Sequence, residues 1–236
     1  HDVLGVEIAV GDHLRDHLVK LPTKEQVTEF LPPYDRGDKR LHPDNPITIA
    51  PQVNEDWLME IRMQNSEAMK RARGVIVEAN RDFKRIFGRG GDPWLEEYMT
   101  EDAEVVLIGQ GTLALPVKVT VRKLREQGQK VGFVRLKWLR PFPTEEVIQS
   151  LSRFKAVGVV DRDYSFGSPH DGAVLYNEIR SALYGADTRP PILGFICGLG
   201  GREVTIPDVI EMLETTAKAA KTGRIDKPTT WVGVRG

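Results

Sequence analysis

The sequence predicts an α/β fold: a mostly parallel open sheet flanked by helices, preceded by an extended linker and a long helix. Strand and helix patterns alternate four times after residue 102, at the spacing typical of parallel βα units. Residues 105–108 are all apolar, as in a strand that is buried on both faces. Before these units, residues 54–87 carry an uninterrupted helical pattern.

Composition limits the classes of function. With 236 residues, the chain can hold one ample core, or one domain and part of another. Its 33 basic and 34 acidic residues nearly cancel, which excludes the charge signature of a partner such as nucleic acid. No apolar run approaches the roughly 20 residues that span a bilayer, and no signal-peptide pattern opens the chain, so we expect a cytoplasmic protein without membrane insertion.

The first residues predict a strand at 3–10, rich in β-branched residues. Because the chain starts at His1 rather than Met, in the middle of what the sequence indicates is a strand, we expect a further portion upstream. Residues 23–26 have capping-box spacing and predict a short helix to about Leu31, which Pro32 and Pro33 end. Residues 34–52 contain prolines and charges but few apolar residues, which predicts an extended connector.

Asn54 is the expected cap of the long helix, and Gly88 ends it. One stripe of this helix is apolar, formed by Leu58, Ile61, Met69, Ala72, Ile76, Ala79, Phe83 and Phe87. A helix of more than about thirty residues is unusual for an isolated domain, so we expect it to pack against something outside the chain. Residues 94–98 are interpreted as a short helical link to the first βα unit.

The first unit predicts a strand at 105–108, a turn at Gly109-Gln110-Gly111 and a helix that stops at Gly128. The inward residues of that helix are expected to be Leu115, Val119, Val121 and Leu124. Three more units follow, with strands at 131–138, 156–160 and 191–197 and helices that begin near Thr144, Ala173 and Pro207. The tail at 225–236 shows no clear element.

A glycine pattern follows the first strand of these units. Gly109, Gly111 and Ala114 match the G-x-G-x-x-A form of the dinucleotide fingerprint. The fingerprint also needs an acidic residue at the end of the second strand, where this chain has Arg135-Leu136-Lys137-Trp138. A tight turn that only glycine allows explains the pattern equally, so nucleotide binding through Gly109, Gly111 and Arg202 stays an alternative.

Two other residue types invite a chemical interpretation. His13 and His17 are four residues apart, a spacing that could share a metal on a helix, although solvated loop histidines explain them as well. Cys197 is the single cysteine, which excludes disulfides and cysteine-ligated clusters within the chain. On a predicted buried strand, Cys197 is expected to behave as a small hydrophobe.

Two loops should meet at one edge of the sheet, because each follows the carboxyl end of a strand. In the first, Asp161 and Asp163 flank Arg162. These side chains could clamp a substrate or bind a cation, or they could form hydrogen bonds with polar groups of the same loop or of a neighbouring domain. In the second, residues 198–202 form a glycine-rich turn whose Arg202 could hold a carboxylate or phosphate. Neither loop supplies a nucleophile with a base.

Five stretches of this chain together resemble the alpha subunit of the 2-oxoacid:ferredoxin oxidoreductases. They are Glu29-Phe30-Leu31-Pro32-Pro33-Tyr34, residues 105–111, Arg140-Pro141-Phe142-Pro143, Asp161-Arg162 with Ser165-Phe166-Gly167, and Gly198-Leu199-Gly200-Gly201-Arg202. Their order and spacing cover nearly the whole chain, and the last three are not general features of α/β folds. The resemblance therefore adds a specific expectation to the fold.

The resemblance implies a domain similar to the C-terminal domain of transketolase at 102–222. Residues 1–31 would then end a pyrimidine-binding domain, 32–101 would be linker and long helix, and 223–236 a tail. It also implies a heteromeric enzyme with beta, gamma and delta-type subunits, which cleaves a 2-oxoacid oxidatively, forms an acyl-CoA and passes electrons to ferredoxin or another acceptor.

Thiamine diphosphate, Mg²⁺ and 4Fe-4S clusters would belong to the whole complex, and no cofactor or catalytic residue is assigned to this chain alone, since the residues expected to contact thiamine lie upstream of His1. For this chain, the resemblance implies a surface that contacts other subunits or domains, formed by Asp161, Arg162, Ser165, Phe166, Gly200 and Arg202.

Overall fold

The computed structural model describes residues 21–235, which form two compact units. The first contains the described residues up to Arg62 together with Val77–Gly90, and the second contains Met63–Ile76 together with the chain from Gly91 onward. The strand predicted at 3–10 and both histidines of the possible metal pair, His13 and His17, lie outside the described residues.

The first unit confirms the predicted short helix, α2, at Lys24–Phe30. Its capping box is present: the Thr23 hydroxyl accepts from the amide of Gln26 at 3.3 Å, and the Gln26 side chain accepts from the amide of Thr23 at 3.0 Å. The ring of Phe30 packs edge-on against Phe83 and Phe87, with centroids 5.6 and 5.5 Å away. This small aromatic cluster joins α2 to the end of the long helix.

The long helix, α3, extends over Glu55–Phe87, and Gly88 ends it in the left-handed region at φ +67°, as predicted. Asn54 occupies the cap position but its side chain binds Asp56 at 3.2 Å rather than a backbone amide. The connector before α3 contains a short 3-10 helix, Gly37–Lys39, and an isolated bridge between His42 and Asn45. It forms no core, in agreement with its composition.

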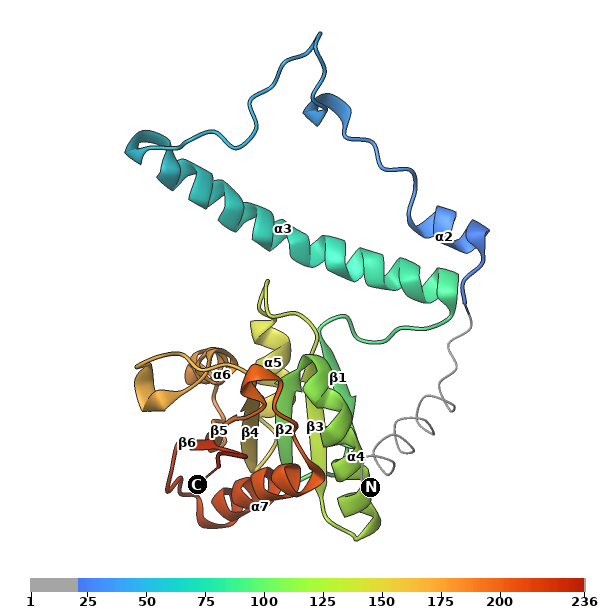
Figure 1. Ribbon diagram of the computed structural model, residues 1–236. Coiled ribbons are helices and arrows are strands. Elements are labelled where there is room, and N and C mark those ends of the chain that lie inside the picture. Colours follow the sequence, from blue (N-terminus) through green and yellow to red (C-terminus); the bar gives the residue numbers. More distant parts are fainter. Residues whose placement is uncertain (1–20, 236) are drawn as a thin grey trace. The chain divides into compact units, whose positions relative to one another are not determined.

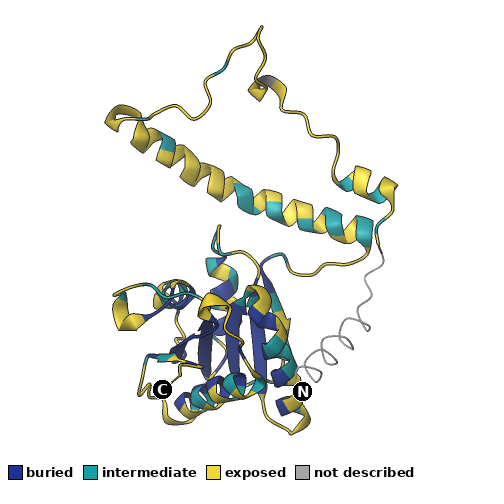
Figure 2. Cartoon of the chain, in the orientation of Figure 1, coloured by how far each residue is buried: buried dark blue, intermediate teal, exposed yellow. Residues whose placement is uncertain are grey.

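No residue of α3 is buried among the described residues, as the yellow and teal helix in Figure 2 shows. The predicted stripe is half-buried at Ile61, Ala72, Ile76, Phe83 and Phe87 and exposed at Leu58, Met69 and Ala79. Other apolar side chains of α3 are open to solvent, with exposed fractions of 65% for Trp57 and 79% for Met59. The helix thus presents much apolar surface that the described chain does not cover.

The second unit contains a six-stranded sheet in the order β1-β3-β2-β4-β5-β6. All neighbouring pairs are parallel except β1 with β3, which confirms the predicted α/β class. The strands are β1 (Leu95–Tyr98), β2 (Val105–Gln110), β3 (Val131–Leu136), β4 (Ala156–Asp161), β5 (Ile192–Ile196) and β6 (Thr229–Trp231).

Helices cover both faces of this sheet (Figure 1). The first face has α4 (Ala114–Glu126) and α7 (Ile206–Thr222), and the second has α5 (Thr144–Leu151) and α6 (Val174–Tyr184). Alternate residues of β2 serve the two cores, since Val105 and Leu107 pack with the first pair of helices and Val106 and Ile108 with the second. This two-sided burial explains why the strand is apolar at every position.

Two strands correct the sequence-based prediction. Residues 94–98 were expected to be helical, yet β1 pairs antiparallel with β3. Asp92 turns the chain into this strand, because its Oδ1 accepts from the amides of Trp94 and Leu95 at 2.7 and 2.8 Å. The tail, where no element was expected, forms β6 alongside β5. Both are edge strands, so their pairing depends on distant residues rather than on their own pattern.

Two helix details also differ from the prediction. Helix α4 follows a 3-10 turn at Gly111–Leu113, so Val117 and Val121 point inward, whereas Leu115 is exposed and Val119 half-buried. The turn sets the rotation of the helix, which the periodicity alone assigned incorrectly. Helix α5 begins with Thr144 and has Pro143 at its cap position, rather than Thr144 as the cap.

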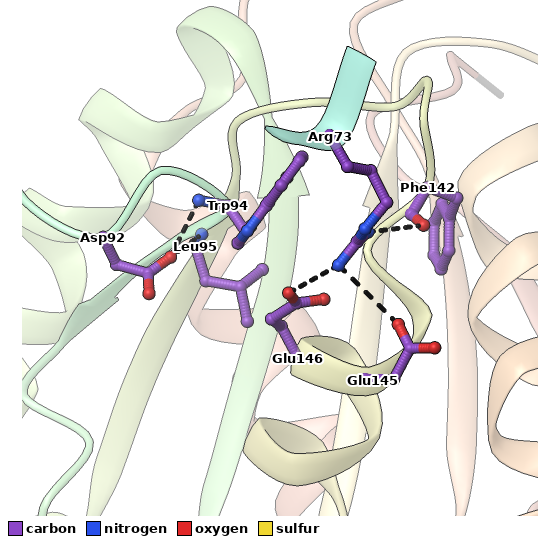
Figure 3. A network of polar contacts seen from close by, with 7 residues as sticks. All are labelled: Arg73, Asp92, Trp94, Leu95, Phe142, Glu145 and Glu146. Atoms are coloured by element: carbon purple, nitrogen blue, oxygen red, sulfur yellow. Dashed lines mark hydrogen bonds and ion pairs between the residues drawn. The ribbon is translucent and has the colours of Figure 1, made fainter. Parts of the chain in front are cut away.

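Within the second unit, Arg73 joins residues 63–76 of α3 to the start of α5 (Figure 3). Its guanidinium lies 4.4 Å from the ring centroid of Trp94 and donates to Oε1 of Glu146 at 2.7 Å. It also donates to the carbonyl of Phe142 at 3.4 Å, and Glu145 lies 3.7 Å away. A half-buried arginine that stacks and bonds at once holds this segment more firmly than an exposed ion pair would.

Candidate functional site

The carboxyl ends of the parallel strands carry the loops that the sequence singled out. The strand order reverses between β2 and β4, and in open α/β sheets ligands bind beside such a reversal. The loop at 161–167 follows β4 and the turn at 198–202 follows β5, its neighbour in the sheet. The structure therefore places both predicted loops at one edge.

Asp161 is only 2% exposed and serves the fold at this edge. Its Oδ2 accepts from the amide of Tyr176 at 3.0 Å, while Oδ2 of Asp163 accepts from the amide of Val174, also at 3.0 Å. Both side chains thus satisfy amides in the first turn of α6, and Asp163 places negative charge at that end of the helix, where it is favourable. Burial, with the nearby charge of Asp163, raises the pKa of Asp161 to about 8, so it holds a proton at neutral pH.

Arg162 turns away from this pair and lies across the sheet edge. Its Nη1 donates to the hydroxyl of Thr112, in the turn after β2, at 2.9 Å. Its side chain also passes over Gly198, where an added Cβ would lie 2.7 Å from Nε. The bare glycine backbone therefore makes room for this arginine, which connects the turns after β2, β4 and β5.

Aromatic residues gather beside Arg162. The rings of Tyr164 and Phe166 have centroids 4.9 Å apart, and Tyr164 lies 5.0 Å from Trp231 of β6. Phe166 is 91% exposed, and Ser165 beside it is half-buried, with its carbonyl accepting from the amide of Ser168 at 3.0 Å. An exposed aromatic cluster of this kind is typical of a surface that another molecule covers.

The glycine-rich turn and the tail complete the edge. Gly198 and Gly200 have φ of +66° and +64°, conformations that favour glycine. Arg202 donates from Nη1 to the carbonyl of Gly233 at 2.6 Å and so fastens the tail after β6. We define the contact edge as residues 161–167, 198–202 and 231–234.

Sequence reasoning missed Trp231, which belongs to the contact edge, and Thr112, which binds Arg162 from the turn after β2. The only local signal for Trp231 was the triplet Thr229-Thr230-Trp231, which is rich in strand-forming residues but too short to predict a strand. Thr112 gave no signal, because its role depends on Arg162, fifty residues later.

The remaining candidates have structural explanations. Gly111 has φ of +64°, as a tight turn requires, and an added Cβ at Gly109 would lie 3.3 Å from the carbonyl of Val160. Cys197 is buried, as predicted, and burial raises the pKa of its thiol to about 12, so it is not a thiolate at neutral pH.

Between residues 21 and 235, no three His, Cys, Asp or Glu side chains group to hold a metal ion, and no helix is long and apolar enough to cross a membrane.

Comparisons with a family model and with curated proteins both find similarity to oxidoreductases that act on 2-oxoacids. Residues 103–209 match the model of the pyruvate:ferredoxin oxidoreductase core domain II. The pyruvate synthase subunit PorA of Pyrococcus abyssi is 38% identical over 217 residues, which are 92% of this chain and 54% of that protein. The ketoisovalerate oxidoreductase subunit VorA of the same organism is 35% identical over 214 residues, covering 91% of this chain and 53% of its own. The chain thus spans about half the length of these curated relatives.

Among solved structures, a 2-oxoglutarate:ferredoxin oxidoreductase from Magnetococcus marinus aligns with 82% of this chain and 29% of its own. That alignment has 18% identity and a TM-score of 0.41.

Proposed function

Because this chain belongs to the 2-oxoacid:ferredoxin oxidoreductase family, we propose that it forms part of the alpha-type subunit of such an enzyme. The enzyme would cleave a 2-oxoacid oxidatively on thiamine diphosphate, form an acyl-CoA and pass the electrons through iron–sulfur clusters to ferredoxin. The observation that supports this most is the match to PorA and VorA subunits over nine tenths of this chain. Relatives of both names match about equally well, which supports the class of 2-oxoacids rather than one member.

The role of this segment in that enzyme is assembly rather than chemistry. A 4Fe-4S cluster needs four ligands, commonly thiolates, and the chain has one cysteine. That cysteine is buried as a thiol, so it does not fit a cluster site. The clusters are therefore assigned to other parts of the complex.

The contact edge is the surface we assign to neighbouring domains or subunits. Phe166, Trp231 and the arginines provide aromatic and guanidinium groups, the types enriched where interfaces derive most of their binding energy. Arg162 and Arg202 are each fixed by a hydrogen bond, so little conformational entropy is lost when a partner binds them. Asp161 contributes indirectly, since it holds the loop to α6.

Reconstitution of the enzyme from separately produced subunits tests this proposal. Phe166→Ala and Arg202→Ala should each weaken assembly, on the order of 2 kcal/mol for a central interface residue, and turnover should fall in proportion to the assembled fraction. Tyr184→Ala is the matched control, because Tyr184 is an aromatic residue 77% exposed at the far end of α6. Unchanged assembly in both edge variants, or equal loss in the control, would contradict the assignment.

The alternative is a free-standing nucleotide-binding module. It predicts that the chain purifies alone with a bound adenine nucleotide, whereas the proposed subunit should purify with iron-containing partner chains. The family match supports the second outcome.

A further inference from the structure

A basic crevice opens where the strand order reverses, outside the contact edge except for Arg162. Its volume is about 650 Å³, and its lining residues are Gln110, Gly111, Thr112, Arg135, Leu136, Lys137 and Arg162. These residues follow or end β2, β3 and β4, three adjacent strands of the sheet. The size falls within the range of about 300–1,000 Å³ that is usual for small-molecule sites.

The lining carries three cations and no acidic side chain. Within residues 21–235, neither Lys137 nor Arg162 forms an ion pair: Lys137 donates to the carbonyl of Asp92 at 2.5 Å, and Arg162 to the hydroxyl of Thr112. Arg135 has one carboxylate partner, Glu96 at 3.6 Å, which is itself bound by Lys118. The crevice therefore keeps most of its positive charge for a ligand.

Two features hold Arg162 over this opening. The hydroxyl of Thr112 fixes its guanidinium, and the backbone of Gly198 leaves the space in which its side chain lies. Gly111, at the same opening, has no atom within 4 Å of the position of an added Cβ, so a ligand can approach the backbone of the turn closely. A preorganised arginine beside open backbone is the arrangement that recognises phosphate oxygens.

We propose that this crevice binds a small molecule bearing a diphosphate or several phosphates, through Arg135, Lys137 and Arg162. Three cations match the charge of a diphosphate, which is about −3 at neutral pH, better than the single charge of a 2-oxoacid carboxylate. This departs from the expectation that the chain alone binds no cofactor, and it does not depend on which reaction the assembled enzyme performs.

The test is calorimetric titration of the 236-residue chain with inorganic pyrophosphate at low salt. We expect saturable binding that the double variant Lys137→Gln/Arg162→Gln weakens at least tenfold. Arg122→Gln, which removes an exposed cation on the outer side of α4, should leave the affinity unchanged. Raising the salt concentration should weaken binding in the wild type more than in the double variant.

Circular dichroism melting establishes that each variant is folded. If Arg162→Gln unfolds the chain, Lys137→Gln alone, at an exposed residue, should still weaken binding about threefold or more. A second titration with pyruvate distinguishes phosphate from carboxylate as the ligand, and pyruvate should bind at least tenfold more weakly. Absence of saturable pyrophosphate binding, equal binding by the double variant, or equal affinity for pyruvate would each overturn the proposal.

Discussion

The α/β unit and the long helix α3 differ in how far their apolar side chains are buried. Five successive residues of β2 are buried, whereas none of the 33 residues of α3 is. Trp57, Met59 and Met63 of α3 are each more than half exposed, although such side chains are usually covered. The α/β unit forms its own core, whereas α3 carries an apolar surface that residues 21–235 do not cover.

The largest effect should come from adding one methyl group to the centre of the sheet. At Gly158 of β4, a new Cβ would lie 2.5 Å from Leu107, 2.6 Å from Thr216 and 2.8 Å from Phe195. Gly158→Ala should therefore lower the free energy of unfolding by about 2–3 kcal/mol through overpacking. Urea unfolding followed by circular dichroism measures the change.

The same substitution in α3 provides the matched control. An added Cβ at Gly74 meets no atom within 4 Å. Gly74→Ala should raise stability by up to about 1 kcal/mol, since alanine favours a helix more than glycine does. If the two substitutions changed stability alike, the two regions would not differ in packing as described.

A second prediction concerns the turn that opens the crevice. Gly111→Val should cost about 1–3 kcal/mol, because Gly111 has φ of +64° with open space around it, so the cost is backbone strain alone. Gly111→Asn should cost less, since asparagine tolerates the left-handed region. Equal thermal midpoints for wild type and Gly111→Val would place the strained turn elsewhere.

Asp161 should make the α/β unit sensitive to pH. The pKa of Asp161 rises from its ordinary value of 3.8 to about 8 in the folded protein. At a pH between these values, the folded chain holds a proton that the unfolded chain releases. Stability should therefore fall as pH rises from about 4 to about 8. Asp161→Asn, which cannot ionise, should lose this slope and gain on the wild type by about 1 kcal/mol or more at pH 8. Parallel curves of stability against pH for the two proteins would contradict this assignment.

The smallest effect on stability is expected on the exposed side of α3. Met59→Gln removes an apolar side chain that is 79% exposed, so the free energy of unfolding should stay within about 0.5 kcal/mol. Self-association of the isolated chain should decrease, since less apolar surface remains open. Sedimentation at several protein concentrations measures this self-association. A wild-type chain that is already monomeric at every concentration would contradict the expectation that the exposed surface of α3 causes self-association.

How well the sequence predicted each part depended on how local its causes are. Gly88 ends α3 as predicted, because a left-handed residue at a helix end is a local requirement. The strands β1 and β6 were missed since each depends on pairing with a distant neighbour. At the site, both loops were placed correctly at the carboxyl edge, but the partners of Arg162 and Tyr164 lie far away in sequence.

The contrast between α3 and the α/β unit is tested most directly by amide hydrogen exchange, measured on the isolated chain and on the assembled enzyme. We expect the strands β2 and β4 to be strongly protected in both samples. Amides of α3 around Trp57 and Met63 should exchange rapidly in the isolated chain and become protected on assembly, because we propose that other parts of the enzyme cover this helix. Strong protection of α3 in the isolated chain, or none in the assembly, would contradict this account.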